Sequence, residues 1–392
     1  MRKSLLAVAA ILAGIGLVSL GNGLVGTLVS VRLDMAKFSA LWIAVVVTGY
    51  PLGFLLGCMF ARLPIERVGA IRAFAALGGL MTVATLAFTL SDSAVLWTLM
   101  RVIEGVCSAV LYTITESWLN ARTAPSSRGL VLAVYMINDK LTYAAGQMLM
   151  KVADPAGPIL FVIGGMAYAL CLIPVSLTTY ESPLAARAPG LNIVRLYGVS
   201  PLGVAATFSS GLINTPVVGL APIWLANHGF TTDDIVAFMT AMMLGGLALQ
   251  WPIGWLSDRF DRRRVLFVIA AGTLGLSALL ALAGGAPIGV LIALSALFGG
   301  LSFAIYPLAV AHANDYVDRT QAVTVSSGLL LSWALGSVAG PPIASALMGF
   351  LGPVGLFTHA TGFAAVLVCF AFWRMTRRAE LPLHRQDALN PE

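Results

Sequence analysis

Four charged residues lie inside stretches that are otherwise apolar, and they are the part of this sequence most able to do chemistry. Arg101 and Glu104 fall in one apolar run, and Asp139 and Lys140 fall in the next. A charge near the middle of a bilayer costs at least about 2.5 kcal/mol, so the charges retained there mark substrate or proton pathways. The four charges sum to zero. A carboxylate in such a cluster could take up a proton when a substrate draws its cation away.

Each of these two runs carries a polar stripe at helical spacing. The first stripe consists of Arg101, Glu104, Ser108, Tyr112 and Thr115. The second consists of Tyr135, Asn138, Thr142 and Gly146, with Asp139 and Lys140 at its edge. A polar stripe cannot face lipid, so we expect each one to face a water-filled cavity or a partner helix. The alternative is a static neutral cluster that only holds the two helices together.

The partners of the four charges can be predicted from helix geometry. Consecutive residues of a helix point about 100° apart, so we expect Asp139 and Lys140 not to pair with each other. If the two runs are antiparallel neighbours, Glu104 comes to the depth of Lys140, and Arg101 reaches towards Asp139.

The second half of the chain has no such charges at the matching places. Aligning Gly105 with Gly300 sets Ala296 and Gly299 opposite the first two charged residues. We therefore expect the chemistry to be confined to the first half.

Composition identifies lipid as the solvent of the elements that carry these residues. Apolar residues make up 59% of the 392 and charged residues 10%, against roughly 25% charged in a soluble domain. We expect an all-α integral membrane protein whose helices each approach or exceed the ~20 residues that cross a bilayer. The twelve expected spans are 4–31, 39–61, 71–90, 94–119, 128–152, 157–179, 199–226, 233–256, 264–284, 287–313, 321–348 and 353–374.

Two stretches 192 residues apart indicate that the chain is two similar halves. They are the segments 62–72 and 254–264, each between two apolar runs and each rich in basic residues. We expect a first six-helix bundle at 1–180, a linker at 181–198, a second bundle at 199–378 and a tail at 379–392. Asn22 and Asn214 are also 192 residues apart.

The two segments fit parts of the pattern G-x-L-x-D-R-x-G-R-R and so resemble the hinge loops of the major facilitator superfamily. The resemblance implies two pseudo-symmetric six-helix bundles that expose a central site to each side of the membrane in turn. It assigns gating roles to seven residues: Glu66, Arg67 and Gly69 in the first loop, Gly254, Asp258 and Arg259 in the second, and Glu116, which would brace Arg67.

Further motifs resemble the bacterial YcaD-like branch of this superfamily. They include Gly146-Gln147, Gln250-Trp251-Pro252-Ile253-Gly254 and Tyr306-Pro307, whereas Asn138-Asp139-Lys140 looks like an addition to that pattern. In the family, the helices that would carry Asn22, Asn214 and Tyr306 line the cavity. Tyr306 and Trp333 would then be aromatic walls of the site. The alternatives are hydrogen bonds between helices for the two Asn residues and simple packing for the aromatic rings.

Loop charges predict the orientation. Of the 23 Lys and Arg residues, Arg32, Lys37 and Lys151 fall in the outer loops and two lie in the membrane, which leaves 18 on the inner side when both termini are cytoplasmic. This distribution predicts that both termini lie inside, and the resemblance to a bacterial branch implies an inner-membrane protein. It also accounts for the +6 net charge without a nucleic-acid partner.

Three functions are compatible with these observations. The leading hypothesis is a monomeric, proton-coupled secondary transporter of a small organic solute, with a carboxylate attracted by Arg101 and Lys140. The second is a drug:proton antiporter. The segment Gly336-Ser-Val-Ala-Gly340-Pro341 looks like an element of that family, but in this chain it lies on the eleventh expected helix and not on the fifth. On the eleventh helix, we expect its small residues to pack against the hinge loop. The third is a metal importer using Met239 and Met243, although 14 Met residues make that spacing common by chance. We expect no enzyme activity, no cofactor and no resident metal site.

Overall fold

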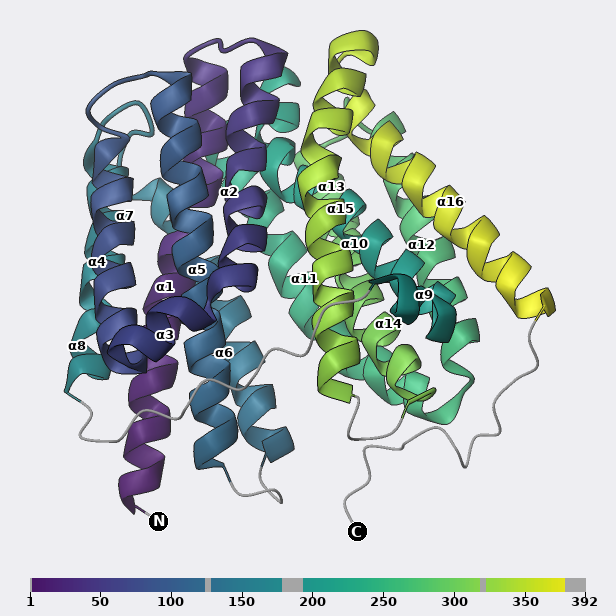
Figure 1. Cartoon of the computed structure of the whole chain (residues 1–392). Coiled ribbons are helices and arrows are strands. Elements are labelled where there is room, and N and C mark those ends of the chain that lie inside the picture. The colour runs from purple at the N-terminus through teal and green to yellow at the C-terminus, as the bar shows by residue number, and fades with distance from the viewer. Residues whose placement is uncertain (1, 124–127, 178–192, 318–321, 378–392) are drawn as a thin grey trace. The chain divides into compact units, whose positions relative to one another are not determined.

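The structure, a computed structural model, describes residues 2–123, 128–177, 193–317 and 322–377. The predicted linker at 181–198 is described only from residue 193, and the predicted tail at 379–392 lies outside the described residues. Within the described residues every regular element is a helix. The chain separates into two compact units, Met1–Arg187 and Ala188–Glu392, called here the N-terminal and C-terminal units; Figure 1 shows each as a set of long helices.

The helices follow the predicted spans closely. The N-terminal unit contains α1 (Arg2–Met35), α2 (Ala40–Phe60), α3 (Arg62–Val68), α4 (Ala70–Ala87), α5 (Ala94–Arg122), α6 (Arg128–Met148), the short 3-10 helix η2 (Leu149–Lys151), α7 (Ile159–Leu170) and α8 (Leu172–Ser176). The C-terminal unit contains α9 (Ile193–Val199), α10 (Pro201–Asn227), α11 (Thr232–Arg259), α12 (Arg262–Leu282), α13 (Ile288–Ser302), α14 (Ile305–Asn314), α15 (Ala322–Leu351) and α16 (Gly355–Arg377).

Eleven segments of the described residues are long and apolar enough to cross a membrane. The other predicted span is α6, which is not among the eleven and which carries Asn138, Asp139 and Lys140. The predicted all-α membrane fold is confirmed. The span that falls outside the eleven apolar segments is the one with polar and charged residues near its centre.

Two predicted single spans are broken helices, and a proline accounts for each break. Pro174 stands four residues after Leu170, where α7 ends, and Pro307 stands four residues after Phe303, where α13 gives way to α14. Proline has no backbone N–H for the carbonyl four residues earlier, and its ring crowds that carbonyl. The chain therefore bends at these points instead of running straight.

Glycines let one pair of helices in each unit pack backbone to backbone. A Cβ added to Gly53 of α2 would lie 2.0 Å from the carbonyl oxygen of Val102 in α5. In the C-terminal unit, a Cβ on Gly245 of α11 would lie 1.9 Å from the carbonyl oxygen of Ala296 in α13. Such close approach requires small residues. Helices α2 and α5 therefore match α11 and α13.

These contacts correct the predicted alignment of the two halves. A Cβ on Gly105 would lie 2.1 Å from the carbonyl oxygen of Tyr50, and a Cβ on Gly299 would lie 2.0 Å from that of Met242, which is 192 residues after Tyr50. Gly105 thus matches Gly299 and not Gly300. The residues opposite Arg101 and Glu104 are therefore Ser295 and Phe298, one position earlier than the sequence alignment gave.

A second pair of helices in each unit packs in the same way. Gly146 of α6 lies against the carbonyl of Leu20 in α1, and Gly336 of α15 lies against the carbonyl of Phe208 in α10. Gly340 also meets α10, at Pro216. Gly336 and Gly340 thus pack against α10, and their predicted packing against the hinge loop is wrong.

Candidate functional site

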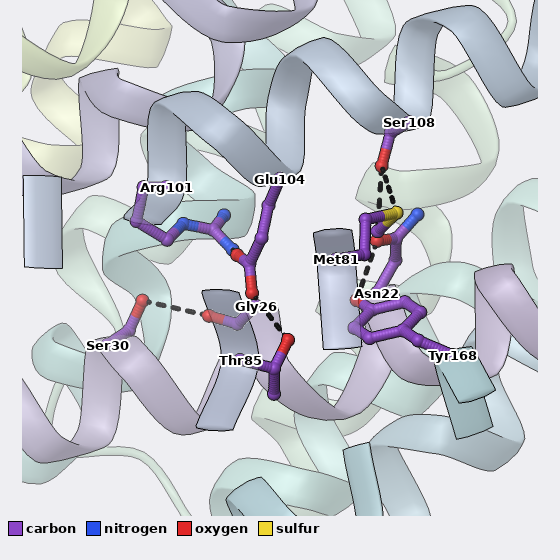
Figure 2. A network of polar contacts seen from close by, with 9 residues as sticks. All are labelled: Asn22, Gly26, Ser30, Met81, Thr85, Arg101, Glu104, Ser108 and Tyr168. Carbon is purple, nitrogen blue, oxygen red and sulfur yellow. Dashed lines mark hydrogen bonds and ion pairs between the residues drawn. The ribbon is translucent and has the colours of Figure 1, made fainter. Parts of the chain in front are cut away.

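Arg101 and Glu104 form an ion pair within α5. The Nη1 atom of Arg101 lies 2.8 Å from Oε2 of Glu104, and the hydroxyl of Thr85 in α4 donates to Oε1 at 2.9 Å, as Figure 2 shows. The guanidinium also lies over the ring of Tyr50 in α2, 4.6 Å from its centroid. Only 1% of the Glu104 side chain is exposed. This pair is enclosed, and it ties α5 to α2 and α4.

Asp139 of α6 has a different environment. Its Oδ1 atom accepts a hydrogen bond from the hydroxyl of Tyr112 in α5 at 2.8 Å and a further one from the hydroxyl of Ser19 in α1. Its Oδ2 atom lies 3.6 Å from the Nζ atom of Lys140. The side chains of Asp139 and Lys140 are 16% and 32% exposed. This second pair is partly open and is held by two hydroxyl groups.

The predicted partners of the four charges are therefore wrong. Asp139 pairs with Lys140, because the flexible four-carbon stem of lysine can reach back across the angle between neighbouring side chains. Arg101 pairs with Glu104 one turn along the same helix. Among the described residues, no ion pair joins Arg101 to Asp139 or Glu104 to Lys140. The four charges form two neutral pairs of unequal exposure.

Asn22 and Asn138 make hydrogen bonds between helices of the N-terminal unit. The Oδ1 atom of Asn22 accepts from the hydroxyl of Tyr168 in α7 at 2.9 Å and from that of Ser108 in α5 at 3.5 Å (Figure 2). The Nδ2 atom of Asn138 donates to the backbone carbonyl of Leu12 in α1 at 3.0 Å. The interhelical alternative thus describes Asn22 in this structure, and Asn138 makes a contact of the same kind. Their direct contact with a solute stays a prediction.

The C-terminal unit repeats part of this arrangement without the charges. The Nδ2 atom of Asn214 donates to Ser210 and to the backbone carbonyl of Ser302, each at 3.1 Å, close to the break between α13 and α14. The rings of Tyr306 and Trp333 meet edge to face with centroids 6.2 Å apart. Both rings are partly exposed, as the predicted aromatic wall requires.

Sequence reasoning missed four residues of these networks. They are Ser19, Tyr50, Thr85 and Tyr168. One signal was present, because Ser19 stands three residues before Asn22 and so shares its helix face. For Thr85 and Tyr168 the sequence held no comparable signal, since their helices carry no polar stripe.

The hinge segment of the C-terminal unit is a buried ion-pair bridge. Arg262, at the start of α12, binds Asp258 at 3.0 Å and also Asp315, just after α14. Its side chain is 5% exposed. Arg259 instead stacks on Trp255, with its guanidinium carbon 3.9 Å from the ring centroid. The central cation of this hinge is thus Arg262, which the motif did not single out. Of the predicted gating residues here, Gly254 lies in open space, where an added Cβ would touch nothing.

The hinge segment of the N-terminal unit is exposed. Glu66 pairs with Arg62 one turn earlier within α3, and both side chains are about half exposed. Gly69 ends that helix with a φ of 84°, a backbone conformation that favours glycine. Glu116 accepts a hydrogen bond from Tyr135 at 3.4 Å. Among the described residues no ion pair joins Glu116 to Arg67, so the expected brace is absent from this conformation.

The methionines proposed as metal ligands are core residues. Met239 and Met243 are 0% and 5% exposed, and the adjacent Met242 is also buried. Within the described part of the chain, no group of three or more His, Cys, Asp or Glu side chains is arranged to hold a metal. Packing accounts for the methionine spacing.

Comparisons with known proteins converge on one family. The sequence profile of the Major Facilitator Superfamily matches residues 203–391. The uncharacterized MFS-type transporter YcaD of Salmonella enteritidis PT4 (strain P125109) is 29% identical over 349 residues, covering 86% of this chain and 88% of the relative. YcaD of Escherichia coli (strain K12 / DH10B) is 29% identical over 347 residues, with the same coverage.

Solved structures share the fold. The nucleoside transporter NupG superposes with a TM-score of 0.77 over 96% of this chain and 99% of its own, at 15% identity. A D-xylose-proton symporter superposes with a TM-score of 0.76 over 98% and 99%, also at 15% identity. At these identities the likeness concerns the arrangement of helices and not the solute.

Proposed function

Because this chain is a transporter of the major facilitator superfamily, we propose that it carries a small organic solute across the bacterial inner membrane in company with a proton. The observation that carries the proposal is the unequal exposure of the two charge pairs. Glu104 is closed off and satisfied by Arg101 and Thr85, whereas Asp139 and Lys140 are partly open. We assign proton binding to Asp139 and a structural role to Glu104.

The contacts of Asp139 support a simple exchange. Its ion pair with Lys140 is long, at 3.6 Å, so an anionic solute can compete for the Nζ atom. Once Lys140 turns to the solute carboxylate, Asp139 takes up one proton and keeps its hydrogen bonds with Tyr112 and Ser19. One negative charge and one proton enter together, and the site stays neutral. Neutrality matters because an unpaired charge in low dielectric costs several kcal/mol.

The C-terminal unit supports an apolar or aromatic part in the solute. Tyr306 and Trp333 present two partly exposed rings, and the residues of this unit that match Arg101 and Glu104 are uncharged. Ring faces and edges favour aromatic or aliphatic groups. The substrate class that fits is therefore a small carboxylate with an apolar portion.

Orientation and conformational cycling form part of the proposal. We expect both termini in the cytoplasm, the hinge segments on that side as gates, and alternating access to one central site. Gly198 lies just before the 27-residue helix α10, and Asn227 is its last residue. Single cysteines at these two positions should react from opposite sides of the membrane in a protein without its native thiols. Reaction from the same side would contradict this orientation.

The test of coupling uses purified protein in proteoliposomes. Asp139→Asn should abolish solute accumulation driven by a pH gradient and preserve counterflow, which moves no net proton. Asp154→Asn, at an exposed loop position, is the matched control and should behave as the parent protein. If Asp139→Asn accumulates solute at the parent rate, Asp139 is not the proton site.

The substrate class is tested separately by thermal stabilisation of the purified protein with organic acids, amphipathic cations and metal ions. Stabilisation by carboxylates that is lost in Lys140→Gln supports the proposed solute. Stabilisation by amphipathic cations alone would instead favour the drug-antiporter alternative.

A further inference from the structure

A shallow pocket lies in the C-terminal unit, apart from the residues assigned to transport. Its polar lining comes from the ends of three helices: Arg263 begins α12, His312 and Tyr316 lie at the end of α14 and just beyond it, and Arg374 lies near the end of α16. The first residues of α10, from Ser200 to Leu202, complete the wall. From this geometry we propose that the pocket binds a phosphate group.

The balance of charge in the lining is positive. Arg263 is 5% exposed at its side chain and pairs with Asp261 at 3.0 Å, so its charge is matched. No ion pair to Arg374 occurs within the described ranges; its guanidinium lies 5.7 Å from the ring centroid of Trp373. The nearby acids Asp258 and Asp315 are bound by Arg262. An anion in the pocket would therefore meet one uncompensated guanidinium and a second, buried one.

The donors suit phosphate in particular. A guanidinium binds two oxygens of a phosphate at once through parallel N–H groups. Tyr316 contributes a hydroxyl group to the lining and His312 a ring nitrogen. The positive end of the α10 dipole points to the same place and favours negative charge.

Two sources could supply that phosphate. Phe372 and Trp373 of α16, beside Arg374, are 60% and 48% exposed, as residues of a lipid-facing surface are. A phospholipid at this surface could place its headgroup in the pocket. A soluble phosphate compound could enter from the aqueous side instead. The site chemistry is shared, and the experiment distinguishes the sources.

Occupancy would act on the hinge of this unit. Arg263 directly follows Arg262, and Tyr316 directly follows Asp315, so the pocket shares its wall with the Arg262–Asp315 ion pair. A phosphate bound to Arg263 and Tyr316 would hold α12 against the end of α14. We therefore expect binding to stabilise the protein against unfolding as well as to be measurable directly.

The experiment titrates the full-length protein in a neutral detergent and measures binding together with thermal stability. The three probes are short-chain phosphatidylglycerol, inorganic phosphate, and short-chain phosphatidylcholine with matched acyl chains. Arg374→Gln should weaken binding about tenfold or more, as expected for losing a charged hydrogen bond. Arg374→Lys should recover part of the affinity. Arg377→Gln, on the same helix but outside the lining, should leave binding unchanged.

Saturable binding of phosphatidylglycerol alone, dependent on Arg374, supports the site and assigns its phosphate to a lipid headgroup. Arg374-dependent binding of inorganic phosphate supports the site and assigns it to a soluble compound. The proposal is overturned if neither anionic probe saturates. It is also overturned if Arg374→Gln and Arg377→Gln weaken binding equally, or if phosphatidylcholine binds as tightly as phosphatidylglycerol in both the parent and Arg374→Gln.

Discussion

Asn138 in the N-terminal unit donates a hydrogen bond to the backbone carbonyl of Leu12, and Ser332 in the C-terminal unit donates one to that of Val204. The donors are 194 residues apart in sequence and the acceptors 192. The same offsets relate the glycine contacts of α2 with α5 to those of α11 with α13, and the bonds of Asn22 and Asn214 to the helices carrying Ser108 and Ser302. The two units thus share a scaffold of side-chain-to-backbone contacts.

The charged residues beside this scaffold are not repeated. At the offset of 194, Asp139 corresponds to Trp333 and Tyr112 to Tyr306. One unit therefore has a tyrosine hydroxyl bound to a carboxylate where the other has a tyrosine packed on an indole. Arg101 and Glu104 likewise correspond to Ser295 and Phe298. The comparison teaches that packing requirements are repeated in both halves, while the ion pairs near the middle of the spans occur in one half among the described residues.

The largest effect is expected from breaking the enclosed ion pair. Arg101→Ala would leave the Glu104 carboxylate buried without its cation, at a cost of about 3–5 kcal/mol. The matched change in the other unit, Ser295→Ala, removes one neutral hydroxyl, which donates to the carbonyls of Phe238 and Ile292, and should cost about 1 kcal/mol. Thermal unfolding of both variants measures the difference. Equal midpoints would show that the Arg101–Glu104 pair is not structural, whereas adding Glu104→Gln to Arg101→Ala should restore part of the loss.

The two tyrosines provide the next comparison. Tyr112→Phe removes a hydrogen bond to a carboxylate, worth about 1.5–3 kcal/mol, and should lower pH-driven accumulation about tenfold. Tyr306→Phe keeps the ring that meets Trp333 and should stay within about twofold of the parent protein. Transport into proteoliposomes at a fixed pH gradient measures both. Similar losses in the two variants would mean that the hydroxyl of Tyr112 has no part in coupling.

The matched glycines test the alignment of the units. Gly105→Ala and Gly299→Ala each drive a Cβ into a backbone carbonyl, and we expect each to cost about 1–3 kcal/mol. At Gly300 the nearest obstacle is the end of the Leu249 side chain, which can rotate away. Gly300→Ala should therefore cost less than either. If Gly300→Ala proves to be the most damaging of the three in thermal unfolding, the alignment of Gly105 with Gly299 is incorrect.

The smallest effects on stability are expected at the hinges. Glu66→Ala removes an exposed pair, which contributes about 0.2–1 kcal/mol at most. Asp258→Ala removes one of the two acids of a buried arginine, yet Arg262 keeps Asp315. Asp258→Ala should therefore slow transport several-fold while solute affinity is unchanged, and Glu66→Ala should slow it less. A loss of solute binding in Asp258→Ala would contradict a role in gating alone.

Much of the fold could be predicted because the composition of each segment identifies the membrane spans and repeated motifs identify the two halves. Apolar runs predicted the helices, since each helix must satisfy its own backbone groups in lipid. The repeated spacing predicted the two similar halves. Both helix breaks stand four residues before a proline, yet the sequence alone was interpreted as two straight spans. The four charges within the spans were also identified from sequence, because charge within an apolar run is visible without a structure.

Only the tertiary structure decided which groups meet. Whether Asp139 bonds to Lys140, Tyr112 or Arg101 depends on side-chain rotamers and on the rotation of three helices, and sequence spacing does not fix either. The one-residue error in aligning the two halves at Arg101 had the same origin. Residues 299 and 300 are both glycine, and only the structure shows which of them touches the backbone of the neighbouring helix as Gly105 does. Arg262 became the centre of its hinge because Asp315, 53 residues away, lies beside it. The sequence determined which residues are costly to bury, and packing determined the partners that make their burial possible.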